Sequence, residues 1–187
     1  MKTQPTLYTE RLILRPMTLD DAPRIKELAG AREIAETTAN IPHPYEDGMA
    51  EEFIRPHAEN YAAGTQAVFA ITLRETGELI GAVGLMIKPQ DENAEMGYWL
   101  GKEYWNRGYV TEAAREVIKF GFKELNLHRI HAHYFSRNIA SGKIMQKIGM
   151  KHEGHSRDAL KKWGKFESID RYAIVKDDFL QSEAAGE

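Results

Sequence analysis

The sequence predicts one mixed α/β domain whose central sheet, mostly antiparallel and of about seven strands, is flanked by helices. Its length of 187 residues is normal for one large domain and short for two. No internal repeat, low-complexity stretch or long linker divides the chain. Segments with the alternating pattern of strands are interspersed with segments of helical spacing, and a parallel crossover lies in their middle. We therefore assign residues 1–187 to a single domain.

The first part of the chain contains one strand and two helices. Residues 10–16 alternate loosely and predict a strand, and capping side chains after it begin a helix that ends near Gly30. Residues 31–45 contain two prolines and look irregular. Residues 46–62 have helical spacing, but Pro56 cannot donate the hydrogen bond that a continuous helix needs. We expect this second helix to be kinked or split.

The remainder of the chain predicts three antiparallel-looking strands, then a strand between two helices, and a final pair of strands. Gly149 is well placed to end the second of these helices. Residues 157–165, which are basic, are expected to form the loop between the last two strands. In chain order the strands cover 67–73, 79–87, 95–100, 128–134, 150–155 and 166–176, and the helices cover 111–124 and 139–148.

Composition excludes several classes of protein. The 25 basic and 28 acidic residues leave a net charge of −3, so no overall basic field favours DNA as a partner. The chain has no cysteine, which excludes disulfides, thiolate metal ligands and a cysteine nucleophile. No apolar signal core follows Met1, and no apolar run approaches the roughly 20 residues of a membrane span. We expect a cytoplasmic protein that does not bind membranes.

Residues 95–114 carry the most informative chemical pattern. A strand runs through a short loop into a long helix that begins near Gly108. The first N–H groups of a helix lack partners within it and carry partial positive charge, and a glycine lets the backbone approach a ligand closely. This arrangement suits a phosphate or pyrophosphate group. The alternative is that Gly108 only eases a tight turn, and this segment alone does not distinguish the two.

Two common nucleotide-binding motifs fit this segment less well. A P-loop requires Gly-Lys-Ser/Thr, whereas Tyr109 and Val110 follow Gly108 here. A dinucleotide fingerprint requires two further glycines at fixed spacing and an acidic residue at the end of the next strand, and neither is present. If this segment binds a phosphate-bearing ligand, that ligand is expected to be neither ATP nor NAD.

Residues 136–150 contain further short motifs. Together with earlier segments, they form an ordered set with characteristic spacings along the whole chain. The pieces are Thr9-Glu10-Arg11-Leu12, Leu14-Arg15, Gly97-Tyr98-Trp99-Leu100, Tyr104-Trp105-Asn106-Arg107-Gly108-Tyr109, Thr111-Glu112-Ala113, Asn138-x-x-Ser141 and Lys147-x-Gly149-Met150. Together they resemble the GNAT superfamily of acetyltransferases, and most closely the RimJ/RimL-type protein N-terminal acetyltransferases. The resemblance covers about residues 7–179, which implies a GNAT domain with a short flexible C-terminal tail after it.

The resemblance implies acetyl-CoA as co-substrate and no metal. In this family the strand before the loop splays from its neighbour, and the pantetheine arm pairs with the exposed backbone. Asn138 matches the position whose side chain bonds that arm. Lys143 is a candidate for assisting the coenzyme A phosphates, with a solvated lysine on a helix face as the alternative. The main-chain contacts implied are Tyr98, Trp99 and Leu100 for pantetheine, and Asn106, Arg107, Gly108, Tyr109, Val110 and Thr111 for the pyrophosphate.

For the chemistry, the resemblance places Ser141 near the sulfur of coenzyme A, as a general acid or a stabiliser of the leaving thiolate. The alternative is a small residue that packs at the start of a helix. Many GNAT enzymes have a tyrosine four residues later, where this chain has Met145, which cannot donate a proton. This departure either makes Ser141 more important or leaves protonation to water.

We choose Glu95 as the general base, acting through a water, with its pKa raised by burial in a closed cleft. An ordinary exposed acid at a strand end is the alternative. Asp158, Glu167, His131 and His133 are the other candidates for the base.

Two further patterns carry weaker signals. His131 and His133 share a strand face and could bind a metal with His128 or His155, but the missing cysteines and the usual behaviour of such residues argue against it. The basic residues 157–165 could guide an acidic substrate, the phosphates of coenzyme A or RNA, or they could simply be solvated.

The predicted reaction is transfer of an acetyl group to a primary amine by direct attack in a ternary complex. The acceptor is the N-terminal α-amine of a protein, for example a ribosomal one, or a small-molecule amine, and the sequence does not decide between them. A non-catalytic acyl-CoA sensor or scaffold is the alternative from another class, and Met145 favours it. Exposed aromatic side chains are compatible with a homodimer.

Overall fold

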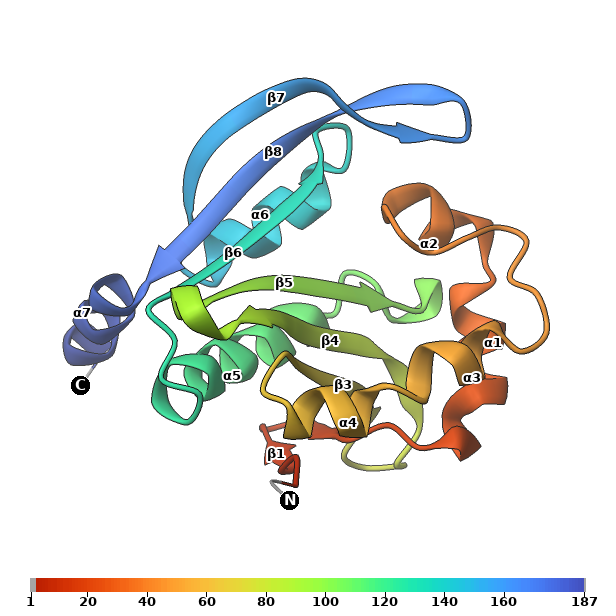
Figure 1. Cartoon of the computed structure of the whole chain (residues 1–187), viewed down its shortest axis with the longest axis horizontal. Helices are drawn as coiled ribbons and strands as arrows, with labels where there is room; N and C mark the ends of the chain where they lie inside the picture. Colours follow the sequence, from red (N-terminus) through yellow and green to blue (C-terminus); the bar gives the residue numbers. More distant parts are fainter. Residues whose placement is uncertain (1–2, 187) are drawn as a thin grey trace.

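An eight-stranded mixed sheet runs through residues 3–186, the part of the chain that the computed structural model describes (Figure 1). The strands lie in the order β1-β2-β3-β4-β5-β6-β8-β7. Among them β5 and β6 pair in parallel, and the other neighbours are antiparallel. The predicted fold class is thereby confirmed. The strands are β1 Leu7–Tyr8, β2 Leu12–Arg15, β3 Gln66–Leu73, β4 Leu79–Lys88, β5 Asn93–Leu100, β6 Arg129–Phe135, β7 Lys151–Lys162 and β8 Lys165–Val175.

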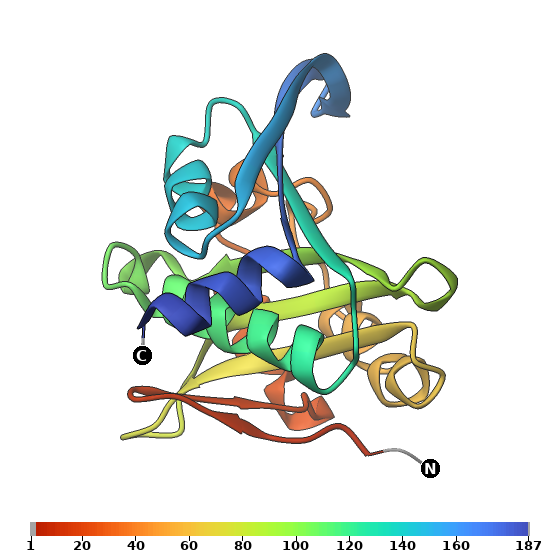
Figure 2. The ribbon, with the colours of Figure 1, turned by 90° about the vertical axis from the view of Figure 1, so that its left-hand side faces the viewer.

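Helices cover both faces of this sheet. Alternation along β5 directs Met96 and Leu100 into the core beneath α5, and Trp99 into a second apolar cluster with α1 and α3. Helix α7 lies beside α5 (Figure 2), where the rings of Phe122 and Phe179 are 5.1 Å apart. None of the helices within residues 3–186 combines the length and the hydrophobicity that a membrane span requires. The helices are α1 Ala22–Ala29, α2 Arg32–Thr37, α3 Met49–Ile54, α4 His57–Ala62, α5 Tyr109–Lys123, α6 Ile139–Lys147 and α7 Lys176–Gly186, with short 3₁₀ turns η1 Leu19–Asp21, η2 Pro89–Asp91 and η3 Lys102–Tyr104.

The sheet divides in its middle. Strands β5 and β6 pair only from Asn93–Glu95 to Arg129–His131, and then diverge. Beyond that point β5 remains paired with β4 as far as Leu100, and β6 remains paired with β8 as far as Phe135. Figure 1 shows the two strands separating toward the end of the molecule that carries α2. The facing backbone edges of β5 and β6 are therefore open.

The sequence interpretation was correct for one difficult element and wrong for others. Residues 46–62 do form two helices, α3 and α4, separated at Pro56. Residues 31–45 are not wholly irregular, because α2 buries the side chain of Ile34. Residues 157–165 are not a loop but the end of the β7–β8 hairpin, with a turn at residues 163–164. The residues after 179, where we expected a tail, continue α7.

Candidate active site

A cleft of about 980 Å³ opens where β5 and β6 diverge, and its lining comes from both faces of the sheet. On one face it is lined by the segment from α2 to α3, and on the other by the start of α5 and by α6. We call these the α2–α3 half and the α5–α6 half. The first is defined by Ile34, Thr37–Pro42, Tyr45, Met49, Glu52, Phe53 and Glu95, and the second by Tyr98, Asn106, Gly108–Thr111, Asn138, Ser141, Lys143 and Lys147.

The start of α5 forms one end of the cleft. Gly108 precedes the helix with φ +79°, and Asn106 has φ +61°, so the loop turns sharply through left-handed backbone. The first helical bond runs from the N–H of Glu112 to the carbonyl of Gly108, at 3.0 Å. No side chain of the described residues caps this helix. The N–H groups of residues 109–111 therefore have no partner within the helix and suit an anion.

The N-terminal segment supports this loop from outside. The guanidinium of Arg11 donates to the carbonyl of Arg107 at 3.0 Å and pairs with the Glu112 carboxylate at 2.7 Å. The hydroxyl of Thr9 donates to the same carboxylate at 2.6 Å, and the Arg11 guanidinium lies 4.7 Å from the centre of the Tyr109 ring. Thr9 and Arg11, near the start of the chain, thus pack against the start of α5, although 103 and 101 residues separate them from Glu112.

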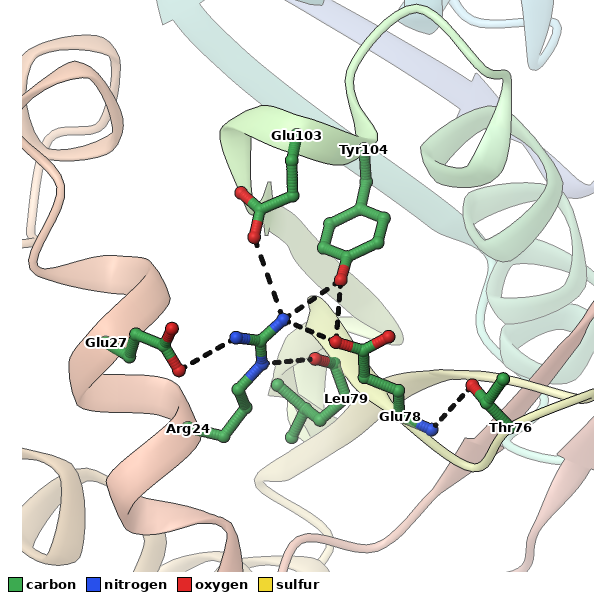
Figure 3. Close-up of polar contacts among 7 residues, drawn as sticks. All are labelled: Arg24, Glu27, Thr76, Glu78, Leu79, Glu103 and Tyr104. Carbon is green, nitrogen blue, oxygen red and sulfur yellow. Dashed lines mark hydrogen bonds and ion pairs between the residues drawn. The ribbon is translucent and has the colours of Figure 1, made fainter.

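A second network holds the other side of the loop (Figure 3). Arg24 of α1 donates to the Tyr104 hydroxyl at 2.9 Å and pairs with Glu78 at 2.7 Å. The Tyr104 hydroxyl also donates to Glu78 at 2.8 Å. Next to it, the indole N–H of Trp105 donates to the carbonyl of Leu100 at 2.8 Å. These contacts tie η3 to α1 and to the β3–β4 turn, so the loop before α5 is fixed at both ends.

Two hydroxyl groups meet in the α5–α6 half. The side chains of Tyr98 and Ser141 share a hydrogen bond of 2.8 Å, and Ser141 is buried. Asn138 accepts from the N–H of Ser141 at 3.4 Å and so caps α6. Burial raises the pKa of Tyr98 to about 12, which keeps its phenol protonated at neutral pH. Our sequence interpretation used only the backbone of Tyr98 and missed this hydroxyl.

Glu95 lies where β5 and β6 part, on the face of the sheet opposite Tyr98. Its carboxylate is 2.7 Å from Nδ1 of His133 and 3.9 Å from Nε2 of His131. The hydrogen bond with His133 lowers the pKa of Glu95, and this effect exceeds the opposing effect of burial. The expectation of a raised pKa is therefore wrong. The structure combines two of the candidate bases, Glu95 and His133, into one pair that lines the cleft.

The remaining sequence candidates divide into those that line the cleft and those that do not. Lys143 is exposed and lines it. Met145 also belongs to the lining, although it packs into the core and only 1% of its surface is exposed. Asp158 and Glu167 do not line the cleft. Asp158 is exposed to solvent, and Glu167 pairs with Arg137 at 3.0 Å.

Arg107 is also absent from the lining, and its carbonyl is bonded to Arg11. Within residues 3–186, no three His, Cys, Asp or Glu side chains gather closely enough to hold a metal ion. His155 lies beside Asp170, at 3.4 Å, rather than beside His131 or His133.

Charge is segregated between the two halves of the cleft. Among its lining residues, the carboxylates Glu52 and Glu95 belong to the α2–α3 half, and the ammonium groups of Lys143 and Lys147 belong to the α5–α6 half. An anionic, phosphate-bearing ligand is thus favoured on one face, and a cationic one on the other. Open strand edges, a helix start that suits a pyrophosphate and hydroxyl donors beside it fit coenzyme A, and they define an acetyl-CoA-dependent acyltransferase as the class.

The chain belongs to the GNAT acetyltransferase family, because the family described as Acetyltransferase (GNAT) domain matches residues 11–151. The sequence is 34% identical over 176 residues to the "Uncharacterized N-acetyltransferase p20" of Bacillus licheniformis, covering 93% of this chain and 98% of the relative. Family membership makes the protein an acetyl-CoA-dependent N-acetyltransferase, as the sequence predicted.

Two solved structures with bound coenzyme show the same fold. The RimL ribosomal L7/L12 α-N-protein acetyltransferase, solved with coenzyme A, aligns with a TM-score of 0.85 and 16% identity over 93% of this chain and 99% of that one. The spermidine N-acetyltransferase of Vibrio cholerae, solved with coenzyme A and spermine, aligns with a TM-score of 0.80 and 23% identity over 92% and 99%.

Proposed function

We propose that this enzyme transfers the acetyl group of acetyl-CoA to a primary amine by direct attack within the cleft. The observation that supports the proposal is that the cleft extends between β5 and β6 from one face of the sheet to the other. Ser141 and Tyr98 lie on the face with the start of α5, and Glu95 with His133 on the opposite face. Thioester and amine can therefore enter from opposite faces and meet between β5 and β6, which supplies the proximity that the reaction needs.

Each pair of side chains has a distinct task in this proposal. The Glu95–His133 pair takes the proton that the amine loses, directly or through one water, as the amine nitrogen bonds to the thioester carbon. The Ser141–Tyr98 pair donates a hydrogen bond or a proton to the sulfur as the carbon–sulfur bond breaks. Because Met145 has no proton to donate, the phenol of Tyr98, bonded to Ser141, supplies a tyrosine hydroxyl from a strand instead of from α6.

The coenzyme-binding residues are proposed from the same geometry. The N–H groups of residues 109–111 hold the pyrophosphate, the open edge of residues 98–100 pairs with the pantetheine arm, and Asn138 bonds the arm through its amide. Lys143 lies on the exposed side of α6 and contributes charge to the phosphates. The acceptor is a protein N-terminal α-amine or a small amine, in keeping with the names of the ribosomal-protein and spermidine enzymes that share this fold.

The test combines calorimetry with acetyl-CoA and an assay of thiol release against amines and N-terminal peptides. Ser141→Ala and Tyr98→Phe are each expected to lower kcat by about 100-fold with unchanged acetyl-CoA affinity, the usual contribution of a positioned acid. In a double-mutant cycle the two losses should not add, because the hydroxyls act as one unit. Turnover equal to the wild type in both variants would remove this pair from the mechanism.

Glu95→Gln tests the opposite face of the sheet. We expect it to lower kcat and to change the acidic limb of the pH–rate profile, whereas an unchanged limb would exclude this base. Saturable acetyl-CoA binding without thiol release from any acceptor would instead favour the non-catalytic sensor.

A further inference from the structure

The tip of the β7–β8 hairpin joins the two parts into which the sheet divides. Strands β6 to β8 with α6 form one part, and β1 to β5 with α1 to α4 form the other. Within residues 3–186, strand pairing connects them only between residues 93–95 and 129–131. In Figure 1 the hairpin, in blue, bends away from the sheet and ends above α2. Contacts at its tip therefore span the opening of the cleft.

Lys162, the last residue of β7, makes the central contact of this tip. Only 9% of its surface is exposed. Its ammonium donates to the carbonyl of Ile41 at 2.7 Å and to that of Ala39 at 3.3 Å, and it lies 5.3 Å from the centre of the Trp163 ring. Burial, and then the charge of Arg137, lowers the pKa of Lys162. A buried ammonium satisfied by carbonyls is an unusual use of lysine on a hairpin.

Other side chains of the same region hold the same segment. Trp163 lies 5.6 Å from the guanidinium of Arg32 and 6.2 Å from the ring of His43. Arg137, at the start of α6, donates to the carbonyl of Glu36 at 2.6 Å and pairs with Glu167 at 3.0 Å. Residues 36–43 are thus held to the part of the molecule that carries α6 by Arg137 at Glu36, by Lys162 at Ala39 and Ile41, and by Trp163 at His43.

The segment held in this way is a wall of the cleft. Residues 37–42 all line the α2–α3 half, where the lining is mostly apolar and the carboxylates are Glu52 and Glu95. Moving this wall changes the width of that half without touching the start of α5. The contact of Lys162 with Ala39 and Ile41 therefore fixes the position of the wall that faces Glu95 across the α2–α3 half.

We propose that Lys162 is a specificity-determining residue that fixes residues 37–42 across the cleft and restricts the acceptor to compact amines with an apolar body, in preference to extended peptides. This inference rests on the proposed function, because it assigns the α2–α3 half to the acceptor. Lys162 acts through the backbone of Ala39 and Ile41 and is a positioning residue.

The kinetic test uses leucinamide and a leucine-initiated octapeptide as acceptors, with acetyl-CoA. The wild type should have the higher kcat/KM for leucinamide. In Lys162→Met we expect the KM for leucinamide to rise about tenfold, the usual effect of losing hydrogen bonds from a charged donor, with kcat and the acetyl-CoA KM unchanged. The preference for leucinamide over the octapeptide should fall by a similar factor. Lys162→Arg should restore it, since a guanidinium can reach both carbonyls.

Lys161→Met is the matched control. Lys161 precedes Lys162 on the same strand, but it is exposed and lies over the Phe166 ring at 5.6 Å, away from residues 36–43. Its kinetics should equal those of the wild type. A wild type that prefers the octapeptide, or an unchanged acceptor preference in Lys162→Met, would overturn the proposal. So would a parallel rise in the acetyl-CoA KM, because that indicates a general loss of structure.

Hydrogen exchange separates this inference from the proposed function. Amides of residues 36–43 should exchange faster in Lys162→Met than in the wild type or in Lys161→Met. If no amine is acetylated by the wild type, the proposed function fails, and exchange still shows whether Lys162 holds the wall. Equal exchange in all three proteins would overturn the role of Lys162 regardless of turnover.

Discussion

His57 should make the stability of the protein fall steeply below neutral pH. This residue is the first of α4, with 5% of its surface exposed and neither ring nitrogen hydrogen-bonded within the described part of the chain. Its ring packs edge-on against Phe53, a residue of the cleft wall, at 4.7 Å. Burial lowers the pKa of His57 from 6.5 to about 4, because the charged form would lose its hydration without gaining a partner.

The magnitude follows from proton linkage. Above pH 6.5 the ring is neutral in both states and makes no pH-dependent contribution to stability. As pH falls below 6.5, His57 becomes protonated in the unfolded chain, whereas in the folded protein it stays neutral until about pH 4. The free energy of unfolding therefore decreases through this window, by about 2 kcal/mol at pH 5 and by about 3 kcal/mol in full.

Urea unfolding followed by tryptophan fluorescence tests this value at about pH 7.5 and about pH 5, the two sides of the window. We compare the wild type with His57→Phe, which keeps a ring against Phe53. The variant should lose about 2 kcal/mol less between the two pH values. Any packing cost of the larger ring cancels, because each protein is compared with itself. His128→Phe, at an exposed position, controls for the loss of a histidine. An identical pH dependence in wild type and His57→Phe would refute the reasoning.

Three further substitutions test the site and the divided sheet. Gly108→Val should weaken acetyl-CoA binding at least about tenfold in calorimetry, because a branched side chain is strained at φ +79° and crowds the amides of the helix start; unchanged affinity would contradict the assignment of this loop. Arg11→Met should raise the acetyl-CoA KM with little change in kcat, since Arg11 and Glu112 hold the loop from outside; a lower kcat at unchanged KM would point to a different role. Gly81→Ala should lower stability by about 1–3 kcal/mol in thermal unfolding, as overpacking does, because its Cβ would lie 2.3 Å from the carbonyl of Trp99 on β5. Gly97→Ala on the facing strand is the control, since its Cβ meets nothing within 4 Å. Equal melting temperatures for the two variants would exclude this close approach.

Most secondary structure could be predicted because its signals are local. Pro56 divides α3 from α4 as expected, since a proline removes a helical hydrogen bond wherever the helix lies. The same local argument located the glycine at the start of α5. It fails for residues 157–165, where a run of basic residues predicts a loop but the chain forms the end of the β7–β8 hairpin. There Lys162 is buried against carbonyls from a distant segment, and no local pattern records that contact.

The sequence by itself determined the order of most elements, the fold class, the family and the loop whose backbone suits a pyrophosphate, because periodicity, turn residues and motif spacing are properties of neighbouring residues. Only the tertiary structure decided which side chains meet. Tyr98 and Ser141 come together from residues 43 apart, and Glu95 meets His133 only because β5 and β6 pair at that point. Such contacts depend on strand register, twist and the place where pairing ends, and these are set by the packing of the whole sheet.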